Sequence, residues 1–126
     1  MSVTSTELAK VAAMAADKKK ATDIVMLDLR SISDVCDYFV IATAANRRMA
    51  DSIIDEIEEK VRVNCDEKPY SIEGRESSHW ILMDYGSVVV HVFDYETRKF
   101  YRLEHLWGDA QRVLLDLEGA ADTKAE

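Results

Sequence analysis

Proline and glycine are scarce in this chain, with one and four residues respectively among 126. Interdomain linkers and low-complexity segments are commonly rich in these two residue types. The sequence also has no internal repeat of the kind that builds solenoids or propellers. We therefore expect one domain over residues 1–118, followed at 119–126 by a flexible polar tail that lacks apolar periodicity.

Long apolar runs are absent as well. The uncharged apolar stretches are too short to cross a bilayer, and residues 1–6 lack the basic start and apolar run of a signal peptide. These features predict a cytoplasmic protein. The two cysteines, Cys36 and Cys65, have no CxxC spacing, so we expect them to be buried as small apolar side chains and not joined in a disulfide.

The common enzyme signatures are missing too. The chain has no P-loop, no GxGxxG, no GxSxG and no HExxH. His79, His91 and His105 fall on separate predicted elements, so no two of them have the spacing of a metal-ligand pair. The sequence therefore predicts no catalytic residue, no metal and no cofactor.

The net charge of −8 bears on the kind of partner. Sequence-independent binding to nucleic acid depends on Lys and Arg side chains that displace counterions from phosphates, and an acidic chain is poorly suited to it. An acidic surface instead attracts and orients a basic protein. We therefore favour a basic protein partner, with no DNA and no membrane involved.

Two amphipathic helices are predicted in the first half of the chain. Thr4 and Glu7 have the spacing of a capping box, and the apolar residues that follow keep helical spacing until a run of lysines at 18–20. Asn46 can cap the second helix, in which apolar residues recur at intervals near 3.6: Met49, Ile53, Ile57 and Val61.

The strands are predicted from short runs of β-branched and aromatic residues between turn signals. Tyr85 and Gly86 separate the last two runs by a tight turn, which predicts a hairpin. The fold class is therefore α/β, with a single mixed sheet of about five strands flanked by helices. The predicted strands are Ile24–Leu29, Tyr38–Thr43, Tyr70–Glu73, His79–Asp84 and Ser87–Phe93.

Two further helices are predicted near the C-terminus. Phe100, Leu103 and Trp107 share one helical face, and Gly108 can end that helix. Asp109 can then cap another helix, which carries the apolar residues Val113, Leu114 and Leu117.

Arg47 and Arg48 stand in the first turn of the second helix, where the helix dipole disfavours cations. One interpretation is a contact with an anion or with RNA. The other, which we rank somewhat higher, is that both are solvated and balanced by the acids of the same helix, including Asp51.

Four blocks of residues, taken together, are far more specific than any short motif. The chain resembles the ribosomal silencing factor (Iojap-like) family over most of residues 18–110, with the blocks in the right order and spacing. One of them is a Trp-(x)3-Asp-Tyr-Gly-x-Val-Val-Val-His string. The blocks lie at residues 21–29, 37–43, 73–74 with 80–91, and 100–110.

The resemblance implies a nucleotidyltransferase-like outline without the catalytic residues, and often a homodimer. It also implies a function without catalysis. Such a factor docks on the large ribosomal subunit through its fourteenth ribosomal protein, of the uL type, and sterically blocks joining with the small subunit. A role in large-subunit biogenesis would use the same docking surface, and the sequence does not separate the two.

The predicted docking patch is the end of the hairpin, where an aromatic anchor, an acid and a turn glycine would meet. Two residues of the last block complete the set. The predicted partner-binding residues are Trp80, Asp84, Tyr85, Gly86, Tyr101 and Glu104.

The alternative from another functional class is a divergent nucleotidyltransferase-like enzyme. Asp28, Asp84 and Asp94 all fall near predicted strand ends, where acidic clusters can hold a metal. The chain lacks, however, the Gly-Ser phosphate loop and the paired carboxylates that such enzymes use.

Overall fold

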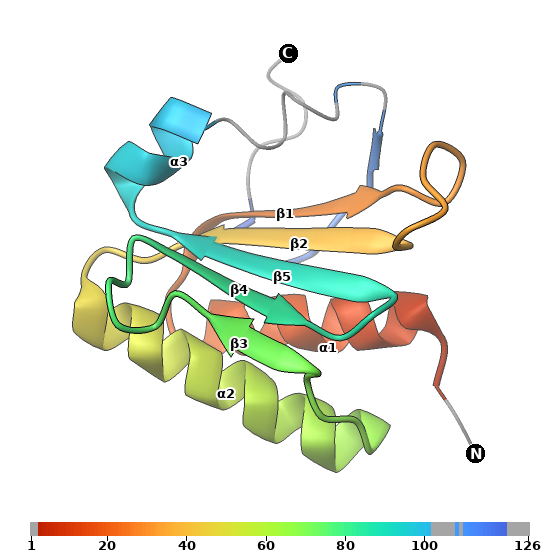
Figure 1. The fold of residues 1–126 in the computed structure, drawn as a ribbon, viewed down its shortest axis with the longest axis horizontal. Coiled ribbons are helices and arrows are strands. Elements are labelled where there is room, and N and C mark those ends of the chain that lie inside the picture. The colour runs from red at the N-terminus through yellow and green to blue at the C-terminus, as the bar shows by residue number, and fades with distance from the viewer. Residues whose placement is uncertain (1–2, 102–107, 109, 121–126) are drawn as a thin grey trace.

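The computed structural model describes residues 3–101, 108 and 110–120. Within these residues the chain forms a six-stranded mixed sheet in the order β3-β4-β5-β2-β1-β6, one strand more than the five expected. Two long helices, α1 and α2, lie side by side on one face of the sheet (Figure 1). The predicted α/β class with a single mixed sheet is confirmed.

Helix α1 spans Ser5–Lys18, and its N-terminus has the predicted capping box between Thr4 and Glu7. The residues that it buries are mostly alanines, so its backbone approaches the sheet and α2 closely. Helix α2 spans Arg47–Cys65 and is capped by the Asn46 side chain, as predicted. It ends at Asp66, whose left-handed backbone (φ 56°) stops the helical hydrogen-bonding pattern.

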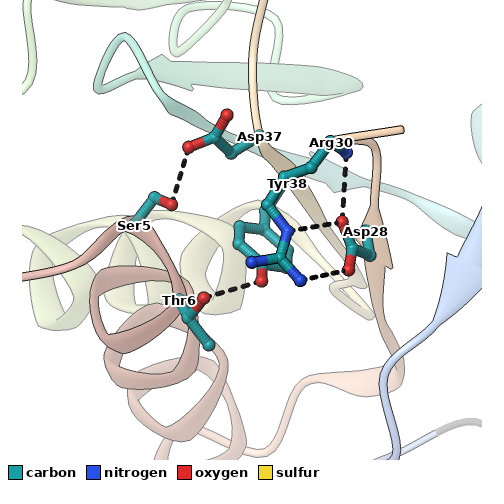
Figure 2. A network of polar contacts seen from close by, with 6 residues as sticks. All are labelled: Ser5, Thr6, Asp28, Arg30, Asp37 and Tyr38. Atoms are coloured by element: carbon teal, nitrogen blue, oxygen red, sulfur yellow. Dashed lines mark hydrogen bonds and ion pairs between the residues drawn. The ribbon is translucent and has the colours of Figure 1, made fainter. Parts of the chain in front are cut away.

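Strands β1 (Thr22–Asp28) and β2 (Tyr38–Thr43) are antiparallel neighbours. The loop between them is fastened to the start of α1, as Figure 2 shows: Ser5 Oγ donates to Asp37 at 2.7 Å, and the hydroxyls of Thr6 and Tyr38 lie 2.6 Å apart. These bonds fix where the loop stands relative to the helical layer.

Strands β4 (Trp80–Asp84) and β5 (Val88–Phe93) form the predicted hairpin, and β3 (Ser71–Glu73) pairs with β4 at the sheet edge. Gly86 occupies the hairpin turn with φ 86°, a backbone conformation that glycine adopts at little cost. Strand β5 runs parallel to β2 in the middle of the sheet, because α2 forms the crossover between the two halves.

The predicted helix capped by Asp109 is wrong. Gln111–Arg112 form β6, which pairs with the end of β1, and residues 113–117 are irregular. Val113, Leu115 and Leu117 pack on the core while Leu114 is exposed, an alternation typical of extended chain. The preceding helix, α3, spans Tyr95–Tyr101, and the predicted Leu103 and Trp107 lie outside the described residues.

Gly119 and Ala120 contact the domain. Gly119 accepts a hydrogen bond from the Ile24 backbone N–H at 2.9 Å and donates one to Asp17 at 2.7 Å, and Ala120 forms a bridge with Ile24. The boundary predicted at residue 118 therefore leaves out two residues that pair with β1, and we propose a boundary after residue 120.

Both cysteines are free and buried, as expected. Among the described residues no helix has the length and apolarity needed to span a membrane.

Candidate partner-binding groove

The two faces of the sheet carry different side chains. Along β4, Ile81 and Met83 point into the core under α1 and α2, whereas Trp80, Leu82 and Asp84 lie on the opposite face. A second, smaller apolar cluster builds that opposite face, which we call the open face. Its buried members are Val25, Leu27, Leu29, Cys36, Ile41 and Phe93.

A groove of about 640 Å³ crosses the open face. This volume lies within the range of pockets that bind ligands or partner side chains. The loop after β1, Tyr70 just before β3, and the hairpin all contribute to the wall. The lining residues are mostly apolar or aromatic, with a few polar groups: Leu29, Ser33, Val35, Cys36, Phe39, Tyr70, Leu82, Asp84, Gly86, Val89 and His91.

The rim of the groove exposes large apolar side chains. Val35 is 89% exposed and Tyr70 is 80% exposed. Exposed apolar groups beside a concave apolar surface are typical of a docking site. Sequence reasoning did not predict either residue, because Val35 lies in a loop far from the hairpin and Tyr70 was assigned only as the start of a strand.

Asp84 and Gly86 are the two predicted docking residues that line this groove. The Gly86 backbone N–H donates to Asp84 Oδ1 at 2.7 Å, which fixes the carboxylate at the turn. Within the described chain, no Lys, Arg or His forms an ion pair with Asp84. The groove thus presents one oriented negative charge.

Trp80 is not at the same end of the hairpin as Asp84. In the strand register Trp80 is opposite Phe93, whereas Asp84 is opposite Val89, so the predicted single patch at one end of the hairpin is wrong. The half-buried Trp80 ring packs on Phe93 with centroids 4.9 Å apart. Its Nε1–H donates to Nδ1 of His91 at 3.1 Å. A role of Trp80 in partner binding stays a prediction.

His91 forms part of the groove and is only 4% exposed. Because Nδ1 accepts the bond from Trp80, the neutral ring carries its proton on Nε2. Burial lowers the pKa of His91 to about 4, which keeps the ring neutral near pH 7. Its Nε2 is buried without a hydrogen-bond acceptor among the described residues.

Tyr85 is buried on the helical side of the sheet and not in the groove, which corrects its place in the predicted patch. Burial raises the pKa of its phenol, and nearby Glu58 adds to this effect. The hydroxyl has no hydrogen-bond partner among the described residues.

Tyr101 is the last residue of α3, and Glu104 lies outside the described residues, so their predicted roles stay predictions.

Arg47 and Arg48 are both exposed in the first turn of α2. Asp51, which was expected to balance them, instead forms an ion pair with Arg75 at 3.4 Å. Arg75 also reaches Asp55 at 3.0 Å, so this arginine ties the β3–β4 loop to α2. Whether Arg47 and Arg48 contact an anion stays a prediction.

The three acids of the enzymatic alternative, Asp28, Asp84 and Asp94, do not lie close together. Asp28 and Asp84 lie at the same end of the sheet, but β2 and β5 separate their strands, which puts them roughly 14 Å apart at the usual strand spacing. Asp94 follows β5 at the opposite end. Asp28 and Asp94 each have a local partner: Arg30 bonds Asp28 (Figure 2), and His79 lies 2.6 Å from Asp94. The described residues contain no group of three acids, histidines or cysteines able to hold a metal.

These features define a small α/β protein with a helical layer on one face of its sheet and an apolar, negatively charged groove on the other. The sequence profile of a family described as "Ribosomal silencing factor during starvation" matches residues 2–126. The chain belongs to this ribosomal silencing factor family.

Individual relatives agree with the assignment. The ribosomal silencing factor of Bacillus subtilis is 42% identical over 107 residues, which cover 85% of this chain and 90% of that protein. A mouse protein named mitochondrial assembly of ribosomal large subunit protein 1 is 32% identical over 92 residues, or 71% of this chain and 40% of that protein. A crystal structure from Chromobacterium violaceum matches with a TM-score of 0.80 and 29% identity, covering 94% of this chain and 97% of that one.

Proposed function

We propose that this protein binds the large ribosomal subunit through its fourteenth ribosomal protein and sterically blocks joining with the small subunit. The observation that carries the proposal is family membership over nearly the whole chain, with relatives named for ribosomal silencing and for assembly of the large subunit. The groove on the open face is the docking surface. A basic ribosomal protein suits it, because the groove holds Asp84, which forms no ion pair within the described part of the chain, and the net charge is −8.

The mechanism is occlusion and needs no catalysis. The factor occupies the face of the large subunit that would meet the small subunit, so no cofactor or metal takes part. The same docking would also allow a role in large-subunit biogenesis. We place the protein in the cytoplasm, where bacterial ribosomes work, and a homodimer is compatible with this role.

A subunit-joining assay tests the proposal. Purified large and small subunits are mixed in magnesium with increasing amounts of the protein, and the joined ribosomes are measured by gradient sedimentation. Joined ribosomes should decrease as the protein approaches one copy per large subunit, whereas adding it after joining should have less effect. Unchanged joining at a large excess of folded protein would overturn the proposal. Any nucleotide turnover with magnesium that Asp84→Asn abolishes would favour the enzymatic alternative.

A further inference from the structure

The turn end of the groove brings a carboxylate and an aromatic ring together. The Tyr70 backbone N–H donates to the Asp84 carbonyl at 2.7 Å, which places the two residues side by side. The Tyr70 ring lies against Gly86, since a β-carbon built on Gly86 would stand 2.8 Å from Tyr70 Cε2. Asp84 Oδ1 accepts from Gly86 in the same turn. The ring and the carboxylate therefore flank one glycine.

Both groups are available to a partner. Tyr70 is 80% exposed, and the half-buried Asp84 pairs with no cation among the described residues. The bond from Gly86 uses one lone pair of Oδ1, so each carboxylate oxygen can still accept from a planar donor. Behind the pair, the groove continues along Leu82 and Val89, which are apolar and suit the stem of a long side chain.

We propose that this end of the groove is a binding site for one arginine side chain of a basic protein partner. The guanidinium bonds the Asp84 carboxylate and stacks on the Tyr70 ring, while the aliphatic stem lies along Leu82 and Val89. The inference rests on the proposed function for the identity of the partner, the ribosomal protein. It goes beyond that function in assigning Tyr70 as a specificity-determining residue.

The chemistry favours arginine over lysine. A guanidinium is flat, so it can stack on a ring and at the same time present two parallel N–H groups to a carboxylate. It is also more weakly hydrated than an ammonium and loses less on entering an apolar groove. An ammonium could pair with Asp84 but would gain less from the neighbouring ring.

A matched pair of labelled peptides tests the site directly. Both are short alternating Gly-Arg or Gly-Lys chains of equal length and charge, titrated into the full-length protein at about 0.15 M salt so that non-specific attraction is screened. The arginine peptide should bind about fivefold more tightly than the lysine peptide, a difference typical of one added cation–π contact. Equal affinities would overturn the proposal.

Substitutions in the site test whether Asp84 and Tyr70 are responsible for peptide binding and for the preference for arginine. Asp84→Asn keeps an oxygen for the Gly86 N–H but removes the charge, and should weaken arginine-peptide binding about tenfold or more. Tyr70→Leu should remove the preference for the arginine peptide and leave the affinity for the lysine peptide unchanged. Glu73→Gln and Tyr95→Leu are the matched controls, because both residues are exposed and neither lines the groove. If the controls lose as much as the site variants, the assignment fails.

Binding to large subunits separates this inference from the function on which it rests. If the wild-type protein binds large subunits and both Asp84→Asn and Tyr70→Leu bind equally well while folded, the arginine site is wrong and the proposed function stands. If the wild-type protein does not bind large subunits at all, the proposed function fails, whatever the peptides show. Weaker binding by both variants, with unchanged melting temperatures, supports the site.

Discussion

The indole Nε1–H of Trp80 donates to Nδ1 of His91, 3.1 Å away across the hairpin. The bond determines which imidazole nitrogen carries the proton, and it joins two aromatic side chains that also pack near Phe93. It makes Trp80 part of the support of the groove. Whether the half-buried ring also contacts a partner, as the sequence suggested, stays a prediction.

Trp80→Phe should therefore destabilise the fold. The change keeps a ring against Phe93 but leaves His91 Nδ1 without its donor, at a cost of about 1–2 kcal/mol in the free energy of unfolding. Trp80→Ala removes the packing as well and should cost about 2–4 kcal/mol. Urea unfolding measures both. Full stability of Trp80→Ala together with lost binding would show instead that the ring is a surface anchor.

Stability should fall in mild acid because of His91. Its pKa is about 4 in the folded protein, below the value of about 6.5 expected when unfolded, so the unfolded chain binds more protons between these values. The free energy of unfolding therefore has its full value, as far as His91 is concerned, above about pH 6.5. It decreases by about 3 kcal/mol as the pH falls toward 4.

His91→Gln should flatten the pH dependence in that range. The hydrogen bond from Arg30 lowers the pKa of Asp28, so its contribution is lost only at more acidic pH, below about 4. Unfolding curves recorded at several pH values would contradict the account if His91→Gln kept the wild-type slope.

The bond between Thr6 and Tyr38 should couple α1 to β2. Thr6→Val and Tyr38→Phe each remove one hydroxyl of a pair that lies 2.6 Å apart. We expect each to cost about 1 kcal/mol, and the double variant to cost less than the sum, because the second change removes a group that has already lost its partner. A double-mutant cycle in urea measures the coupling, and strictly additive losses would show that the bond is unimportant.

Truncation tests where the domain ends. Removing residues 121–126 should leave the melting temperature unchanged, whereas removing 119–126 should lower it by several degrees, because the pairing of Gly119 with Ile24 is lost. Gly119→Ala gives an independent check, since a β-carbon there would stand 2.2 Å from the Ala21 carbonyl oxygen. Equal melting temperatures for both truncations would restore the boundary at residue 118.

Local signals predicted the fold well where they are strong. The capping box of Thr4 and Glu7, the Asn46 cap and the hairpin turn at Gly86 each depend on residues a few positions apart, and all three were found. The C-terminal segment was missed for a physical reason. Val113 and Leu117 fit a helical period, but the bond from the Val113 N–H to Met26 holds the segment extended against β1.

The groove could be predicted only in part. Asp84 and Gly86 were identified because they stand at a tight turn between two predicted strands, where a glycine and an acid occur together. Val35 and Tyr70 come from distant loops, and only the strand order brings them to the same groove. The separation of Trp80 from Asp84 also follows from strand register, since the two residues stand at opposite ends of one five-residue strand. Sequence spacing alone does not show which end of a strand faces a partner.

Co-sedimentation with purified ribosomal particles tests the central claim most directly. The protein is incubated separately with large subunits, small subunits and joined ribosomes, pelleted, and quantified in each pellet. We predict that it pellets with large subunits alone, that added salt weakens binding only modestly, and that Asp84→Asn reduces it. Equal recovery with small subunits, or a steep loss with salt together with equal binding to naked ribosomal RNA, would contradict docking on a ribosomal protein of the large subunit.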